Sequence, residues 1–319
     1  MKTLPLYQVD VFAEKLFTGN PAAVCPLHGW LPDATMQSIA AENNLAETAF
    51  FVADETGAAD YLLRWFTPTV EIELCGHATL ASGHVLLNEL THPREDVRFR
   101  TLHAGVLTVA RREGALWLDL PARTPEPLAS LPDDLLGGLR LLPQTVLASG
   151  NKYFAVYSDA AEIAHLKPDF SRLACLEGKG VVVTALGRPG HEDFVSRFFA
   201  PAMGVAEDPA TGSAHCLLMP YWSARLGRTR LRATQLSARG AHLDCSLEGE
   251  RVWMSGGVRP YLKGEIHVPG RNYSVGRSGG FELERVRIRQ FSQGPIKRSQ
   301  RNMTSFAGYF ENQTVQKPC

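Results

Sequence analysis

The sequence predicts an α+β fold made of two similar units, in each of which many strands accompany one helix that begins at a glycine. Two stretches carry this prediction, ELCGHATL at residues 73–80 and EDPATGSAHC at residues 207–216. Each places an acidic residue or a cysteine shortly before a glycine, followed by a small polar or imidazole side chain and a helix-like run. Strand-like sequence lies on both sides of each helix, which favours the α+β class.

The first unit reads as strands, a short helix, more strands and then the helix that starts at a glycine. LPLYQVDVF at residues 4–12 is rich in aromatic and β-branched residues, which is typical of a strand. In FTGNPAAV, the residues Gly19, Asn20 and Pro21 mark a turn. The remaining expected elements are a helix at 32–42, strands at 46–54 and 61–68, a helix at 76–90 and β-rich sequence from 97 to 121.

The second unit repeats this order. Its expected strands are TVLASGNKYFAVYSD, GVVVTALG and EDFVSRFFAP, followed by a helix at 212–226 and β-rich sequence from 230 to 268. PARTPEP at 121–127 has three prolines in seven residues, which predicts a linker. We therefore expect an N-terminal half at 1–122, a C-terminal half at 123–270 and an appended polar, basic tail at 271–319, which is either a flexible extension or a basic interaction arm.

Composition excludes several classes of protein. Lys+Arg and Asp+Glu are both 33, so no global charge favours nucleic acid or an anionic membrane. No apolar run reaches the ~20 residues of a membrane span, and polar residues interrupt the N-terminal stretch where a signal peptide would be apolar. The six cysteines are dispersed and include no CxxC pair, so we expect no disulfide framework, no metal site and a cytoplasmic location.

The two helix starts are candidates for binding an anion. The first amides of a helix have no intrahelical acceptor, and the helix dipole adds partial positive charge there. Gly76 and Gly212 would let a ligand approach these amides closely. Two such starts that face one another would hold a carboxylate with main-chain donors alone. The alternative is that both are ordinary helices that happen to begin with glycine.

Three side chains near these motifs could carry or assist proton transfer. Glu47, in NLAETAFF, is either a solvent-facing strand residue or a carboxyl group in apolar surroundings, where a raised pKa suits general acid–base catalysis. Asp208 is either a helix N-cap or a site carboxylate. Cys75 is either a reactive thiol at a helix start or a small packing residue. Alignment on the glycines places Thr211 opposite Cys75, so a mechanism with two thiols lacks its second member.

Together, these motifs resemble one known family. FTGNPAAV, NLAETAFF, CGHATLASGHVL and SRFFAPAMGVAEDPATGSAH are similar to segments of the PhzF-like phenazine-biosynthesis isomerases, over residues 4–268. The resemblance implies a diaminopimelate epimerase-like fold, in which two pseudo-symmetric halves each wrap a β-barrel-like sheet round a central helix and the active site lies between them. It also implies a homodimer that needs no cofactor and no metal.

The resemblance also implies roles for residues of this chain. Glu47, His77 and Asp208 match the family's catalytic residues, whereas Gly76, Gly212 and Ser213 fall where the family holds the substrate carboxylate. In the best-known member, the glutamate moves a proton from C3 to C1 of a dihydro-hydroxyanthranilate. The CGHAT form found here, with Cys75 before the glycine, is common outside phenazine pathways, so the expected substrate is a small carboxylate of unspecified structure.

Two other functions compete with this isomerase. The first is an amino-acid racemase or epimerase that uses a thiol on the same fold. The second is a non-catalytic protein that binds a ligand or a partner between the halves. The presence of Glu47, His77, Asp208 and Ser213 together favours catalysis, because a binding protein has no need of a proton shuttle.

Overall fold

The computed structural model describes residues 1–90, 92–176 and 180–269. Residues 1–268 form one compact unit. Its strands run, in chain order, β1 (Lys2–Val11), β2 (Asn20–Pro26), β3 (Glu47–Ala53), β4 (Tyr61–Phe66), β5 (Glu71–Ile72), β6 (Asp96–Arg100), β7 (Val106–Arg112), β8 (Ala115–Pro121), β9 (Glu126–Pro127), β10 (Thr145–Ser149), β11 (Lys152–Val156), β12 (Gly180–Leu186), β13 (Phe194–Phe199), β14 (Arg230–Gln235), β15 (Ala241–Glu248), β16 (Arg251–Ser255) and β17 (Val258–Val268).

The helices are fewer and mostly short. The described helices are α1 (Asp33–Asn43), α2 (Gly76–His84), the π-helical turn η1 (Val85–Glu89) that continues α2, α3 (Asp133–Leu139), α4 (Ala160–His165), α5 (Phe170–Leu173), the 3₁₀ turn η2 (Pro201–Met203) and α6 (Gly212–Leu226). None of the helices in the described residues is long and apolar enough to cross a membrane.

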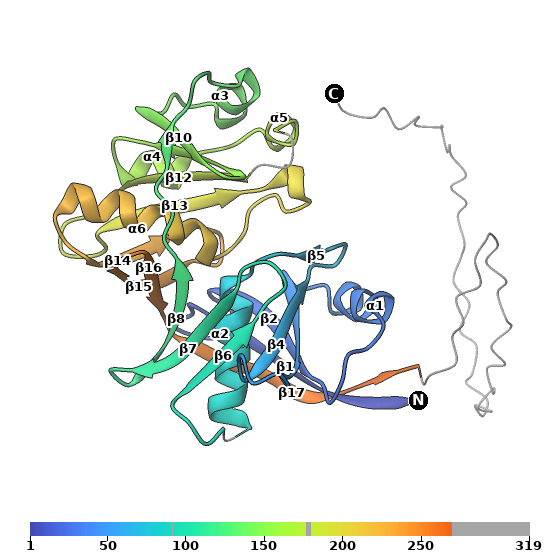
Figure 1. The fold of residues 1–319 in the computed structure, drawn as a ribbon. Helices are drawn as coiled ribbons and strands as arrows, with labels where there is room; N and C mark the ends of the chain where they lie inside the picture. The colour runs from blue at the N-terminus through green and yellow to red at the C-terminus, as the bar shows by residue number, and fades with distance from the viewer. Residues whose placement is uncertain (91, 177–179, 270–319) are drawn as a thin grey trace, which may run out of the picture. The chain divides into compact units, whose positions relative to one another are not determined.

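Helix α2 lies at the centre of the strands formed by the first part of the chain, residues 1–122 (Figure 1). It packs against β1, β2, β3, β7 and β8, and every one of its nine residues is buried. Most residues of GHATLASGH are small, and its buried Thr79 and Ser82 hydroxyls donate to the carbonyls of Cys75 and Ala78, so the helix can be enclosed on every side. The close packing of strands around α2 therefore follows from the small residues of this helix.

Helix α6 has the corresponding place in the second part of the chain. It packs against β8, β14, β15 and β16. Its glycine-started first turn lies against that of α2: a Cβ atom added to Gly76 would lie 3.1 Å from the Gly212 Cα, and one added to Gly212 would lie 3.1 Å from the Gly76 Cα. The two helix starts thus meet head to head, and only glycine at both positions allows this approach without displacement.

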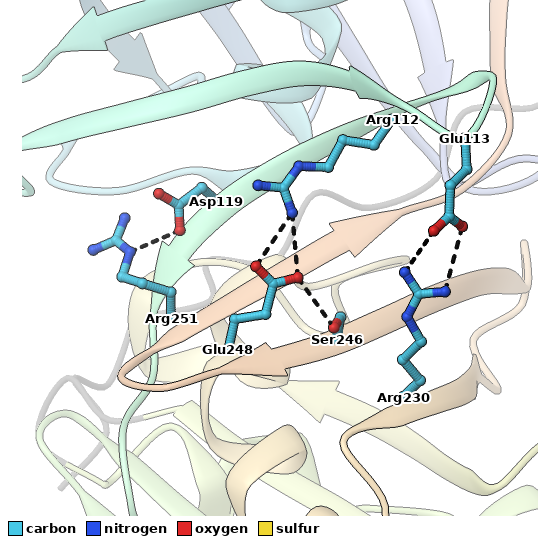
Figure 2. Close-up of polar contacts among 7 residues, drawn as sticks. All are labelled: Arg112, Glu113, Asp119, Arg230, Ser246, Glu248 and Arg251. Atoms are coloured by element: carbon cyan, nitrogen blue, oxygen red, sulfur yellow. Dashed lines mark hydrogen bonds and ion pairs between the residues drawn. The ribbon is translucent and has the colours of Figure 1, made fainter.

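The strands of the two parts are joined in one hydrogen-bonded sheet system. β8, from the first part, pairs antiparallel with β16, from the second. Ion pairs reinforce this join (Figure 2): Arg112 lies 3.2 Å from Glu248, Arg230 lies 2.6 Å from Glu113, and Arg251 lies 2.7 Å from Asp119. The last strand, β17, pairs antiparallel with β1 and so returns to the sheet around α2.

Most predicted elements agree with the structure, with two kinds of difference. Helix α6 spans 212–226 as predicted, and α2 with η1 covers 76–89 of the predicted 76–90. The turn predicted at FTGNPAAV is shorter than expected, because Asn20 and Pro21 are already the first residues of β2. The helices α3, α4 and α5, at four to seven residues each, were not predicted. The predicted tail, 271–319, lies outside the described residues.

Candidate active site

Glu47 and His77 meet where β3 and α2 begin. Glu47 is the first residue of β3, and His77 is the second residue of α2. The His77 Nε2 lies 3.0 Å from the Glu47 Oε2, and these side chains are 4% and 15% exposed. Both atoms are buried, and neither has an aligned hydrogen-bond partner among the described residues. The two groups are therefore close enough to interact electrostatically but are not aligned for a hydrogen bond. Because the Glu47 side chain is 15% exposed, part of it remains accessible to solvent.

Asn20 connects His77 to Asp208. The Asn20 side chain is completely buried at the start of β2. Its Nδ2 donates hydrogen bonds to the Asp208 Oδ1 at 2.7 Å and to the Ala210 carbonyl at 3.0 Å. The same nitrogen lies 3.2 Å from the His77 Nδ1. Residues from both parts of the chain are thereby fixed relative to one another through one amide group.

Thr211 and Gln235 hold the segment that carries Asp208. The Thr211 hydroxyl donates to the Asp208 Oδ2 at 2.5 Å. The Gln235 Nε2 donates to the Asp208 carbonyl at 2.7 Å, and the Gln235 Oε1 accepts from the Thr211 amide at 2.9 Å. Because buried amide groups that use both ends strongly restrict their neighbours, the turn between β13 and α6 has a defined conformation.

Charge interactions shift the pKa values of this cluster. Burial alone would lower the pKa of His77, but the neighbouring Glu47 carboxylate favours the imidazolium and raises that pKa well above its ordinary value. Burial and the negative charge of Glu47 raise the pKa of Asp208 to about 6, against the opposing effects of His77, Thr211 and Asn20.

The pKa of Asp208 predicts how stability depends on pH. The folded chain binds a proton at Asp208 more tightly than the unfolded chain, whose pKa is close to the ordinary 3.8. This stabilising contribution is fully present below about pH 4 and is lost as the pH rises through about 6. We expect Asp208→Asn to reduce the difference in unfolding free energy between pH 4.5 and pH 7.5, measured by urea denaturation.

A matched control separates this effect from a general loss of acidic charge. Asp244, on β15, is exposed, so Asp244→Asn should retain the pH difference of the parent protein. If Asp208→Asn shows the same pH difference as the parent, the shifted pKa assigned to Asp208 is wrong.

Cys75 is buried and is a poor nucleophile in this setting. It immediately precedes α2 and is 5% exposed. Burial, followed by the charge of Glu47, raises the pKa of its thiol to about 11, so the reactive thiolate is scarce near neutral pH. Its counterpart across the helix contact, Thr211, carries no thiol. These observations favour the packing interpretation of Cys75 over the catalytic one.

Three neighbouring side chains are of the kinds that bind zinc, namely Glu47, Cys75 and His77. Their ligand atoms lie within 4.8 Å of one another. However, Cys75 Sγ lies 3.5 Å from the His77 Nδ1, whereas Glu47 contacts the Nε2 on the other side of the ring. Because an imidazole binds one ion through one nitrogen in its own plane, the contacts as they stand do not converge on a single ion.

The structure brings the six predicted site residues to one region. Glu47, His77 and Asp208 are connected through Asn20, and Gly76 meets Gly212 where the two helices begin. Ser213 is the partly buried second residue of α6. Sequence reasoning missed Asn20 and Gln235. The motif FTGNPAAV contained the signal for Asn20, but its asparagine was interpreted as part of a turn.

Comparisons with known proteins agree on one family. Residues 9–257 match the family model described as "Phenazine biosynthesis-like protein". A protein of Pseudomonas aeruginosa named an uncharacterized isomerase is 51% identical over 265 residues, which cover 83% of this chain and 99% of that protein.

Solved structures show a similar fold. A phenazine biosynthesis protein of the PhzF family from Enterococcus faecalis is 44% identical with a TM-score of 0.77, covering 84% of this chain and 100% of the other. A hydroxyproline epimerase from Agrobacterium vitis has a TM-score of 0.54 at 13% identity, covering 83% of this chain and 91% of the other. This second likeness concerns the fold alone, a mixed α/β fold shared with that epimerase.

Proposed function

Because the chain belongs to the family of phenazine biosynthesis-like PhzF proteins, we propose that it is an isomerase that moves a proton on a small carboxylate-bearing substrate. One observation carries the proposal: the buried contact of 3.0 Å between Glu47 and His77, next to the meeting point of the two helix starts. An acid–base group beside a set of main-chain donors is the arrangement that proton transfer next to a carboxylate requires.

Glu47 is the proposed acid and base. One carboxylate oxygen, Oε2, faces the His77 ring. The other oxygen, Oε1, would take the proton from one substrate carbon and return it to another. The His77 ring, 3.0 Å away, orients this carboxylate. Asp208 and the Ala210 carbonyl fix the Asn20 amide, whose nitrogen lies 3.2 Å from the His77 Nδ1. A single positioned general base contributes roughly 10²–10⁴-fold to the rate.

The starts of α2 and α6 are the proposed carboxylate site. Among the described residues, no acceptor is found for the amides of Gly76, Gly212 and Ser213. Two helix dipoles point their positive ends at the same place, which favours an anion there. The hydroxyl of Ser213 adds a further donor. The same donors would stabilise the negative charge that develops on the substrate as the proton leaves.

We also infer that residues 1–122 and 123–270 are the pseudo-symmetric halves of a diaminopimelate epimerase-like fold. Two features support this inference. Each part surrounds one helix that begins at a glycine, and the two helices meet at these glycines. Two pseudo-symmetric halves would explain why the same kind of helix start occurs twice in one chain.

Isotope exchange in deuterated water tests the function. We expect the parent protein to transfer deuterium into at least one member of a panel of small cyclic and amino carboxylates, without an added cofactor. Cys75→Ala should exchange at close to the parental rate, because the buried thiol is not the base. A large loss in Cys75→Ala, with the fold intact, would favour the thiol-dependent racemase. Binding of a carboxylate without any exchange would favour the non-catalytic protein.

A further inference from the structure

Lys152 is a buried cation in the second part of the chain. It is the first residue of β11, and only 9% of it is exposed. Its Nζ donates to the Asn151 Oδ1 at 3.1 Å, although an ammonium group has three donors. Among the described residues it forms no ion pair with a carboxylate. Because a buried charge without a counter-charge costs free energy, stability does not explain why this position holds a lysine.

The groups around Lys152 do not neutralise its charge. Burial lowers the pKa of Lys152, and the nearby Arg123 guanidinium lowers it further by repulsion. Burial raises the pKa of the neighbouring Cys216 thiol to about 12, so this thiol is uncharged near pH 7. Within the part of the chain that the structure describes, Lys152 therefore lies beside a second cation and a neutral thiol.

Arg123 is a second cation without a carboxylate partner among the residues that the structure describes. Its backbone amide donates to the Cys216 carbonyl at 2.9 Å, which holds this residue beside α6. Its Nη1 would lie 3.6 Å from a Cβ atom added to Gly150, so the guanidinium lies next to the turn that precedes Lys152. Two neighbouring cations repel each other, and an anion that contacts both would replace this repulsion with attraction.

Lys152 lies near the start of α6. Phe154, on the same face of β11 by strand alternation, belongs to the core around α6, and its ring centroid lies 5.0 Å from that of Tyr221. The Lys152 charge instead acts on Cys216, more than one turn closer to the helix start. Cys216 is four residues beyond Gly212, which is about 6 Å along a helix axis. The ammonium group thus lies about one helical turn from the proposed carboxylate site.

Phe198 connects Lys152 to the other side of the candidate site. Its ring centroid lies 6.0 Å from the Lys152 Nζ, and its carbonyl accepts from the Asp208 amide at 3.0 Å. Asp208 in turn accepts from Asn20, whose amide nitrogen lies 3.2 Å from the His77 Nδ1. Lys152 is therefore adjacent to the segment that carries Asp208.

We propose that Lys152, together with Arg123, binds a second carboxylate group of the substrate, so that the substrate is a small dicarboxylate. This inference rests on the proposed function, because it takes the amides of Gly76 and Gly212 as the site of the first carboxylate. The second carboxylate supplies the counter-charge that Lys152 lacks. The two anion sites are about one helical turn apart, ~6 Å along the axis, which is of the order that glutarate and adipate can span.

Calorimetric titration with matched ligands tests the second carboxylate site. The probes are glutarate and adipate, with valerate as a monocarboxylate of the same length as glutarate. We expect the parent protein to bind at least one diacid about tenfold or more tightly than valerate, because charge-assisted hydrogen bonds are strong. Lys152→Met removes the charge and keeps a long side chain, so it should bind neither diacid more tightly than valerate. Arg123→Gln should lose part of the preference.

A control variant and a stability measurement exclude a purely structural role. Lys167 is an exposed lysine of the same part of the chain, so Lys167→Met should keep the parental preference for a diacid. Without ligand, Lys152→Met should unfold at a higher urea concentration than the parent, because an apolar side chain replaces a buried charge. A Lys152→Met variant that is less stable and keeps the preference would show that Lys152 only supports the fold, which contradicts the inference.

The remaining outcomes separate this inference from the proposed function. A parent protein that binds valerate as tightly as both diacids, or that binds neither diacid, overturns the second carboxylate site. Deuterium exchange tests the isomerase independently. A parent that prefers a diacid but exchanges no deuterium into any carboxylate contradicts the isomerase and leaves the second site standing. Exchange into monocarboxylates as efficient as exchange into diacids contradicts the second site alone.

Discussion

Glu47→Gln is expected to abolish transfer of solvent deuterium into the substrate while the variant still binds the substrate carboxylate. Glutamine has the same shape but cannot accept a proton, so the rate should fall by roughly 10²–10⁴-fold. Binding should persist because the proposed carboxylate donors are main-chain groups of α2 and α6. The measurements are deuterium incorporation by NMR spectroscopy and ligand affinity by calorimetry.

A second glutamate provides the control for Glu47→Gln. Glu42 is exposed near the end of α1, five residues before Glu47. Glu42→Gln should exchange at the parental rate. If Glu47→Gln also exchanges at that rate, Glu47 is not the acid–base group. If it has lost both binding and the cooperative unfolding transition, the loss of exchange reflects the fold instead of the chemistry.

Gly76→Ala should have the second-largest effect on activity. The added Cβ would lie 3.1 Å from the Gly212 Cα, and because that atom belongs to the backbone, it cannot rotate away. The starts of α2 and α6 must therefore separate by a few tenths of an ångström, and the amides of both move away from a shared ligand. Small misplacements of groups that position a substrate can cost up to about 100-fold in rate. Steady-state kinetics should show a loss of kcat/KM by about tenfold or more.

Gly83→Ala is the matched variant in the same helix. A Cβ atom at this position would lie 2.5 Å from a Val109 side-chain atom, well away from the helix start. Overpacking of this kind typically costs about 1–3 kcal/mol of stability. We expect Gly83→Ala to lower the unfolding free energy yet keep the kcat/KM of its folded fraction. A Gly76→Ala variant that lost stability but kept its activity would show that the helix contact is only structural.

Local signals in the sequence predicted the elements that carry the site. A glycine followed by small and apolar residues at helical spacing predicted α6 within its observed bounds, and the same signal predicted α2. Glu47 was predicted at the start of a strand, as observed. These predictions succeed because the determinants of a helix start or a strand lie within a few residues of it.

Contacts between distant residues could not be predicted in the same way. Asn20 and Asp208 are separated by 188 residues, and no local pattern relates them. An asparagine before a proline is typical of a turn, and this local preference concealed a buried side chain. Gln235 lies on the same face of β14 as the buried Leu231 and Ala233, so strand alternation directs it inward, but no local pattern identifies Thr211 as its partner. The short helices α3, α4 and α5 are too brief to show helical periodicity.

The pairing of β17 with β1 has a consequence for synthesis on the ribosome. Lys2 pairs with Val268 and Val11 with Val258, so the outer edge of β1 has no partner until almost all of the described chain has been made. At about 5–20 residues per second, this wait is roughly 10–50 s. During that time the nascent N-terminal region exposes a strand edge to neighbouring chains. We therefore expect the aggregation of this protein, and its need for chaperones, to depend on the interval during translation before β17 emerges.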